Sequence, residues 1–377
     1  MRFLLLLISL IIGSNSFGQS DSTYTGLKHT GDFRFRIEHD WNSQNSNGTL
    51  RNDRSRLRYR FRFGINYFLD KNSSFGGRLR SGNINDQQGP HITLGGNQGE
   101  FGLVQIGLEK LFYQYQNKNL KVWVGKNAIP LQKINELFWN DNVFPEGIGL
   151  KYKLKLKKKF IQSLGINAGH FIINSNNQTF NKDSYFQFFQ LESNLLNKRI
   201  TLFPALYYFN EIGNFPDGKQ THNLDYTILN FGSLFKVMKN STFKLGIEYY
   251  TNLENYATED SIPFNLRNQK RGFVISAKYG DVNEKGNWLI HLYYANLEKF
   301  AIVDYFAQND WARWDYSSIN ATGSRISNFH GIELRVGYAI KEKFNLILRS
   351  YFVEELVKIG NFKENGSRIR LDLNIGF

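Results

Sequence analysis

Residues 54–67 read Arg54-Ser55-Arg56-Leu57-Arg58-Tyr59-Arg60-Phe61-Arg62-Phe63-Gly64-Ile65-Asn66-Tyr67, an alternation with a period of two. One set is apolar and mostly aromatic: Leu57, Tyr59, Phe61, Phe63, Ile65 and Tyr67. The other set is cationic: Arg54, Arg56, Arg58, Arg60 and Arg62. Successive side chains of a β-strand point to opposite faces of its sheet, so the stretch predicts a strand with one apolar and one cationic face. Helical spacing would scatter both sets around a cylinder.

The length of this stretch favours a membrane-crossing strand. At about 3.3 Å per residue it reaches roughly 45 Å, which is long for a soluble domain and suits a tilted strand in a bilayer. A soluble sheet would bury the aromatic face, whereas a transmembrane barrel would turn it to lipid and leave the arginines in a wet lumen. The reverse orientation is excluded, because each arginine facing lipid near the bilayer centre costs about 2 to 4 kcal/mol.

The amino-terminal residues have the three parts of a secretory signal peptide. Met1-Arg2 precedes the apolar run Phe3 to Ile12, and small residues at Ser16 and Gly18 place cleavage before Gln19. The run is too short to span a bilayer as an anchor. The chain contains no cysteine, so we expect neither disulfides nor a lipid anchor on cysteine. Residues 1–18 are the expected signal peptide, and residues 19–377 the expected single barrel domain.

The alternating pattern recurs along the chain, from Phe33-Arg34-Phe35-Arg36-Ile37 to Arg368-Ile369-Arg370-Leu371. No later segment approaches the roughly 20 apolar residues of a transmembrane helix. Every second connection is short, and the long ones include Asn83 to Gly102, Asn127 to Gly147 and Glu298 to Asn328. The sequence therefore predicts an all-β, antiparallel transmembrane barrel of about 16 strands, with 18 possible. Its short turns would be periplasmic and its long loops extracellular.

Composition narrows the possible partners. The chain carries 47 Lys and Arg against 33 Asp and Glu, a formal net charge of +14 that becomes +13 without Arg2. Basic chains often bind nucleic acid, but these cations alternate with apolar residues inside strands, so we expect no nucleic-acid partner. Anions in the lumen fit better. Aromatic residues make up 16% of the chain, an excess that aromatic girdles at the two membrane interfaces would explain.

Closure of the barrel would set the last strand beside the first and join the cationic faces into one wall. We expect the following residues to line the pore: Arg34, Arg36, Arg54, Arg56, Arg58, Arg60, Arg62, Arg78, Arg80, Lys151, Lys153, Lys155, Arg368 and Arg370. Guanidinium groups can bind carboxylate or phosphate in a bidentate manner, which would make this wall a track for anions. The alternative is a structural salt-bridge network with inward acids such as Glu38, Glu248, Glu333 and Asp372.

Long loops offer a constriction and aromatic contacts. Asn127 to Gly147 is the candidate constriction loop, and its Lys126, Lys133 and Glu136 would face the pore. Two interpretations fit the aromatic loop residues, namely stacking on sugar rings or, as we favour, packing of the loops or a place at the interface. These residues are Phe138, Trp139, Trp311 and Trp314.

The sequence gives little sign of catalysis or metal binding. Its seven histidines lack ligand spacing, so we expect no metal and no cofactor. A hydrolase with His291 beside an Asp or Ser of a neighbouring strand stays open as an alternative, although no nucleophile motif supports it.

The chain resembles bacterial outer-membrane barrels at its end, where Leu371, Leu373, Ile375 and Phe377 match the pattern that the assembly machinery is thought to read. More specifically, it resembles the alginate-export-like porins of Bacteroidetes. The residues that carry this resemblance are Glu38-His39-Asp40-Trp41-Asn42, the ladder Arg54 to Arg62, Gly125-Lys126-Asn127, Asn135-Glu136-Leu137-Phe138-Trp139 and Pro145-Glu146-Gly147.

The resemblance implies passage of anionic polysaccharide, or its oligomers, through a constriction rich in arginine, a role that carries over only to the ladder arginines. It also implies the outer membrane of a Gram-negative bacterium, with lipid, lipopolysaccharide and the assembly machinery as partners. A non-conducting adhesion or assembly barrel remains the other alternative.

Overall fold

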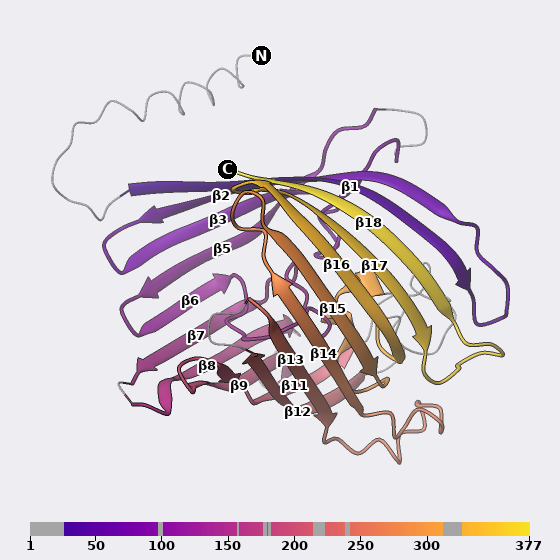
Figure 1. The fold of residues 1–377 in the computed structure, drawn as a ribbon. Helices are drawn as coiled ribbons and strands as arrows, with labels where there is room; N and C mark the ends of the chain where they lie inside the picture. Colours follow the sequence, from indigo (N-terminus) through magenta and orange to yellow (C-terminus); the bar gives the residue numbers. More distant parts are fainter. Residues whose placement is uncertain are drawn as a thin grey trace.

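The computed structural model describes residues 26–96, 101–156, 158–175, 179, 182–213, 223–237, 242–311 and 326–377. The expected signal peptide and Trp314 lie outside these residues. The described part of the chain forms one antiparallel sheet that closes on itself, because β1 pairs with both β2 and β18 (Figure 1).

The strands are β1 (Gly26–Gln44), β2 (Arg54–Phe68), β3 (Ser73–Ser81), β4 (Ile92–Thr93), β5 (Ile106–Gln116), β6 (Leu120–Lys126), β7 (Glu146–Lys155), β8 (Ile161–Asn174), β9 (Ser184–Leu195), β10 (Ile200–Leu202), β11 (Ala205–Gly213), β12 (Asn223–Lys236), β13 (Lys244–Asn252), β14 (Arg271–Gly280), β15 (Trp288–Leu297), β16 (Phe329–Lys341), β17 (Phe344–Glu355) and β18 (Asn365–Gly376). Two single-turn 3-10 helices, η3 (Asp304–Phe306) and η4 (Asn309–Trp311), lie between β15 and β16.

In the described residues the barrel wall has sixteen strands, because β10 and β11 count as one and β4 is not part of the wall. β10 and β11 pair with the same neighbours, β9 and β12, and form one strand interrupted at Phe203-Pro204. Proline has no N–H for the ladder, which accounts for the interruption. β4 is a two-residue addition to β2 within the long β3–β5 connection. The expected all-β barrel of 16 strands is confirmed, and the alternative of 18 is wrong.

Connections alternate in length around the barrel. The β2–β3, β5–β6 and β16–β17 turns have four, three and two residues, whereas the β3–β5, β6–β7 and β15–β16 connections have 24, 19 and 31. All short turns gather at the end of the barrel where β1 begins and β18 ends, and the long connections gather at the other (Figure 1). We call these the short-turn end and the long-loop end.

The alternation along β2 separates the outside of the barrel from its inside. Leu57 and Tyr67 keep 47% and 50% of their surface exposed, whereas Arg60 and Arg62 keep 6% and 8%. The apolar face is therefore the outer surface, and the cationic face points inward. No helix of the described residues is long and apolar enough to cross a membrane.

Aromatic side chains pack together inside the barrel. They come from β8, β9, β11, β12 and β13 and pack against the connection 127–145, which we call the inner loop. Phe138 of this loop stacks on Tyr207 with ring centroids 4.1 Å apart, and Trp139 stacks on Phe186 at 5.1 Å. The aromatic excess thus serves the interior as well as the outer surface, which corrects the explanation by girdles alone. We call this packing the aromatic core.

Candidate functional site

Strand register places the basic residues on one side of the interior. Across β1 and β2, Arg34 lies opposite Arg60 and Arg36 lies opposite Arg58. Across β17 and β18, Arg349 lies opposite Arg370. Like charges that face each other on one sheet surface destabilise it by about 0.2 to 1 kcal/mol per pair. Such a wall therefore needs acidic partners to fold.

Acids on the same strands supply these partners. On β1, Glu38 forms an ion pair with Arg56 and lies 3.6 Å from Arg58. Asp40 of the same strand contacts Arg54 at 2.8 Å and Arg368 at 2.5 Å. Asp372 of β18 contacts Arg36 at 2.6 Å. The salt-bridge network that the sequence left open as an alternative is therefore present. Two of the acids proposed for it, Glu38 and Asp372, belong to it on this wall.

Further ion pairs extend the network to both sides. Glu333 of β16 binds Arg335 at 2.5 Å and lies 3.7 Å from Arg349. Glu248 lies outside the network, because its carboxylate accepts hydrogen bonds from Asn135 and from the N–H of Ile134 in the inner loop.

A β-bulge brings one more acid to the wall. Between β3 and β5 the register shifts at Arg78 and Leu79, so that Glu109 and Lys110 occupy the place of a single residue. An extra residue of this kind re-aims its side chain. Glu109 is buried and lies 2.6 Å from Arg78, 3.0 Å from Arg62 and 3.9 Å from Arg80.

The long β15–β16 connection contributes an acid from outside the sheet. Asp310 of η4 forms an ion pair with Arg370, and its backbone oxygen accepts a hydrogen bond from Arg368 at 3.3 Å. Burial alone would raise the pKa of Asp310. The surrounding guanidinium groups outweigh burial, Arg370 most of all, and hold this pKa well below its ordinary value.

These side chains border a cavity of about 250 Å³, which we call the arginine cavity. Nine arginines line it against five acidic residues, so its described lining has an excess of positive charge. The expected pore residues found there are Arg34, Arg36, Arg56, Arg58, Arg60, Arg62, Arg368 and Arg370, together with Glu136 of the inner loop.

The inner loop forms part of the other side of the arginine cavity. It crosses the interior, since the N–H of Gln132 donates a hydrogen bond to the side chain of Gln190 of β9 and the carbonyl of Ile134 accepts one from Tyr293 of β15. Asn142 accepts a hydrogen bond from Arg62 of β2. Residues of the β3–β5 and β15–β16 connections complete the lining that faces the barrel wall.

The remaining expected site residues lie elsewhere. Arg54 and Arg78 stay outside the arginine cavity, in the ion pairs given above, and Arg80 lines an adjoining cavity of about 480 Å³ between the long loops. Lys126 pairs with Glu146 at 2.5 Å, and Lys133 pairs with Asp141 at 2.7 Å.

We call the inward arginines of β1, β2, β17 and β18 the arginine wall. The lysines of β7 do not join it either. Lys151 and Lys153 each lie 3.1 Å from Glu192 of β9, and Lys155 is exposed at the end of β7. The structure thus divides the expected cationic lining into an arginine group and a separate lysine group.

Sequence reasoning missed several members of the arginine wall. Arg349 is an isolated charge in β17, because the residues that share its face of the strand are Ile347 and Tyr351, so the ladder pattern did not point to it. Glu109 follows Leu108 in the alternating pattern, but no feature of the sequence indicates the β-bulge that directs its side chain to the arginines. Asp310 comes from a connection without periodicity, so only the folded chain shows its role.

The loop aromatics and His291 have packing roles. Phe138, Trp139 and Trp311 are at most 3% exposed, as expected from loop packing rather than from stacking on sugars. His291 hydrogen bonds with Tyr293 at 3.0 Å and lies opposite Arg335 and Lys278. Within the described ranges no group of three or more His, Asp or Glu is placed to hold a metal ion.

Comparisons with known proteins agree with this geometry. The family model described as "Putative porin" matches residues 41–251. Among solved structures, OprB of Pseudomonas putida has a TM-score of 0.55 at 12% identity, over 93% of this chain and 94% of that one. OmpF of Salmonella typhi, in a complex with daunomycin, has a TM-score of 0.54 at 11% identity, over 93% and 98%. A triple mutant of the Rhodopseudomonas blastica porin has a TM-score of 0.50 at 10% identity, over 93% and 100%. A search of curated proteins finds no match.

Proposed function

The chain belongs to the "Putative porin" family and forms a channel in the outer membrane of a Gram-negative bacterium, and from this premise we propose that the channel passes anionic solutes along its arginine wall. The observation that carries this proposal is the excess of arginines over acids around the arginine cavity. A lumen lined by one sign of charge concentrates ions of the opposite sign and repels the others.

The size of the arginine cavity favours narrow solutes. Its volume of about 250 Å³ lies below the roughly 300 to 1,000 Å³ of ordinary ligand pockets. We therefore propose carboxylated oligosaccharides of the alginate type, or smaller carboxylates, as the substrate class, passing in extended form. The constriction would be the inner loop, with Glu136 and Asp141 facing the arginines.

The topology gives the expected direction of the barrel in the membrane. We propose that the short-turn end faces the periplasm and the long-loop end faces the cell exterior, as in other bacterial barrels. We propose further that the apolar outer face contacts lipid and lipopolysaccharide. The terminal Phe377, which exchanges backbone hydrogen bonds with Gly31, would be the signal for the assembly machinery.

The proposal is tested by the selectivity of purified protein in planar bilayers. Reversal potentials in a KCl gradient should show preference for chloride, and this preference should fall as the Debye length drops from about 30 Å at 0.01 M to about 3 Å at 1 M. The triple variant Arg56→Gln, Arg58→Gln, Arg60→Gln should fold and lose much of the preference. A control variant with Lys158→Gln, Lys159→Gln and Lys198→Gln removes three charges from exposed turns and should keep it.

Two results would overturn this function. Cation preference of the natural protein is one, and unchanged selectivity of the arginine variant is the other. Absence of any conductance would support a second candidate, a closed structural barrel, which is favoured by the aromatic core inside the barrel.

A further inference from the structure

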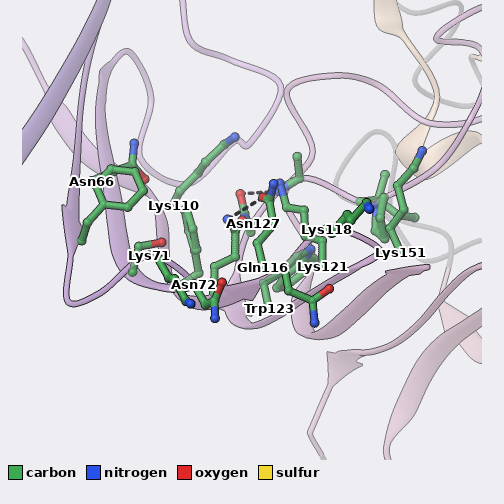
Figure 2. A pocket seen from close by; sticks show the side chains of 18 residues that line it. Asn66, Lys71, Asn72, Lys110, Gln116, Lys118, Lys121, Trp123, Asn127 and Lys151 are labelled. Atoms are coloured by element: carbon green, nitrogen blue, oxygen red, sulfur yellow. Dashed lines mark hydrogen bonds between the residues drawn. The ribbon is translucent and has the colours of Figure 1, made fainter. Parts of the chain in front are cut away.

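A second cavity opens at the short-turn end, with a volume of about 860 Å³ (Figure 2). The described residues that line it include no acidic residue. They include five lysines, namely Lys71, Lys110, Lys118, Lys121 and Lys151. Figure 2 shows that these lysines lie on neighbouring turns and strands on one side of the barrel. We call this cavity the lysine vestibule.

The lysine vestibule is elongated along the strands. Lys71 lies in the β2–β3 turn and Lys118 in the β5–β6 turn, at the mouth. Lys121 of β6 faces Gln116 of β5, and Lys110 lies six residues further along β5, which corresponds to about 20 Å. Positive charge is therefore spread along a path and not gathered at a single point.

The acids near this path are few. Glu192 contacts Lys151 at 3.1 Å and also serves Lys153. Lys121 lies directly opposite Lys151 in the β6–β7 register, so two like charges occupy neighbouring positions on the two strands. Like charges placed in this way repel each other, and a bound anion relieves that repulsion. The arginine cavity differs, because acids lie within ion-pair distance of most of its guanidinium groups.

The mouth of the lysine vestibule is held in shape by its turns. Gln116 donates its backbone N–H to the carbonyl of Asn72 at 2.7 Å, which ties the β5–β6 turn to the β2–β3 turn. The Asn117 side chain accepts hydrogen bonds from the N–H groups of Asn119 and Leu120 at 3.0 and 2.9 Å. A site with a fixed mouth loses less entropy when it binds a ligand.

The lysine vestibule continues the arginine wall. Along the inward face of β2, Arg62 borders the arginine cavity and Asn66 borders the vestibule, four residues or about 13 Å apart. Lys110 lies opposite Arg78 in the β3–β5 register. Both cations lie over the ring of Phe144, with the Lys110 ammonium 4.5 Å and the Arg78 guanidinium 5.0 Å from the ring centroid. Basic groups thus follow one another from one cavity to the next.

We propose that the lysine vestibule is a second anion-binding station, which holds a chain-like solute bearing several carboxylate or phosphate groups at the short-turn mouth. The proposal rests on the function proposed above and names where the solute is held. Lysine is suited to such a place, because its ammonium is a hydrated point charge on a flexible stem, whereas arginine fixes an anion in a planar fork. A mouth with lysines binds loosely and releases readily.

Calorimetric titration of the full barrel in detergent tests this station without requiring conductance. Inorganic triphosphate and tri-galacturonate serve as the phosphate and carboxylate probes, and maltotriose serves as the neutral control. The natural protein should bind at least one of the charged probes at low salt and should not bind maltotriose. Each removed charge at about 4 Å in water is worth roughly fivefold in affinity, so the triple variant Lys110→Gln, Lys121→Gln, Lys151→Gln should weaken binding about a hundredfold.

Controls separate this proposal from the function proposed above. The variant with Lys158→Gln, Lys159→Gln and Lys198→Gln should bind as the natural protein does, and a heat-dependent shift on electrophoresis should show that all barrels are folded. Equal affinity in the lysine variant, or no binding of either probe, overturns the lysine vestibule as a station. Cation preference in bilayers would overturn the proposed function instead.

Discussion

Replacing Glu109 by glutamine removes one carboxylate from a buried group of three arginines. The carboxylate of Glu109 lies 2.6 Å from Arg78, 3.0 Å from Arg62 and 3.9 Å from Arg80, and the side chains of Arg62 and Arg80 are less than 10% exposed. Glutamine keeps the shape and one acceptor oxygen but leaves three positive charges facing one another. We expect this barrel to fold with a lower free energy of unfolding.

The magnitude follows from burial. Breaking a buried ion pair by removing one partner costs about 3 to 5 kcal/mol. Because glutamine still accepts one hydrogen bond, we place the cost of Glu109→Gln near the lower end, at about 3 kcal/mol. The matched control is Glu354→Gln, whose ion pair with Lys363 leaves the two side chains 47% and 46% exposed. Ion pairs this open to solvent contribute about 0 to 1 kcal/mol.

Urea unfolding in lipid vesicles, followed by tryptophan fluorescence, measures both variants under the same conditions. The double variant Glu109→Gln, Arg78→Gln should recover part of the loss, because it removes one of the unbalanced charges. Equal losses for Glu109→Gln and Glu354→Gln would refute the reasoning, since burial would then make no difference. A loss below about 1 kcal/mol for Glu109→Gln would refute it as well.

Three further predictions concern the inner loop, a turn and the orientation of the barrel. Phe138→Ala should cost about 3 to 5 kcal/mol and loosen the inner loop, so single-channel conductance should rise; unchanged conductance would show that this loop does not narrow the path. Backbone N–H groups of Asn72 and Ser73 lower the pKa of Asp70 below its ordinary 3.8, so its stabilising effect is present above that pH and is lost as pH falls through the lower folded-state pKa. Unfolding curves should then separate natural protein from Asp70→Asn at pH 7 and converge in strong acid, and a constant difference would contradict this. Epitope tags within 253–270 should be accessible on intact cells and tags within 281–287 should not, and the opposite pattern would invert the barrel.

The fold could be predicted from sequence because the decisive strand separates its two faces so cleanly. From Arg54 to Arg62 every second residue of β2 is an arginine, and lipid accepts only the other face. Closure then requires β18 to meet β1, which brings Arg368 and Arg370 to the same wall as Arg36. Periodicity and the closed sheet together were sufficient to identify most of the arginines around the cavity.

The filling of the interior could not be predicted in the same way. Phe186 and Phe188 of β9 point inward while Phe189 points outward, so this strand is apolar on both faces. Such a pattern indicates burial on both sides but does not say what covers the inner face. The cover comes from Phe138 and Trp139 in a connection whose sequence has no period. The acids of the ion pairs were equally hard to predict, because Glu109 depends on a bulge and Asp310 on a loop.

The pairing of β1 with β18 has a consequence for how the protein becomes functional. Ion pairs across this seam join residues more than 300 positions apart in sequence, such as Arg36 with Asp372 and Arg368 with Asp40. Before the first and last strands meet, Arg368 and Arg370 are separated from Arg36, so the wall is not yet continuous. The charge distribution of the lumen is therefore completed only when the barrel closes, and an incompletely inserted barrel would be electrically different from a mature one.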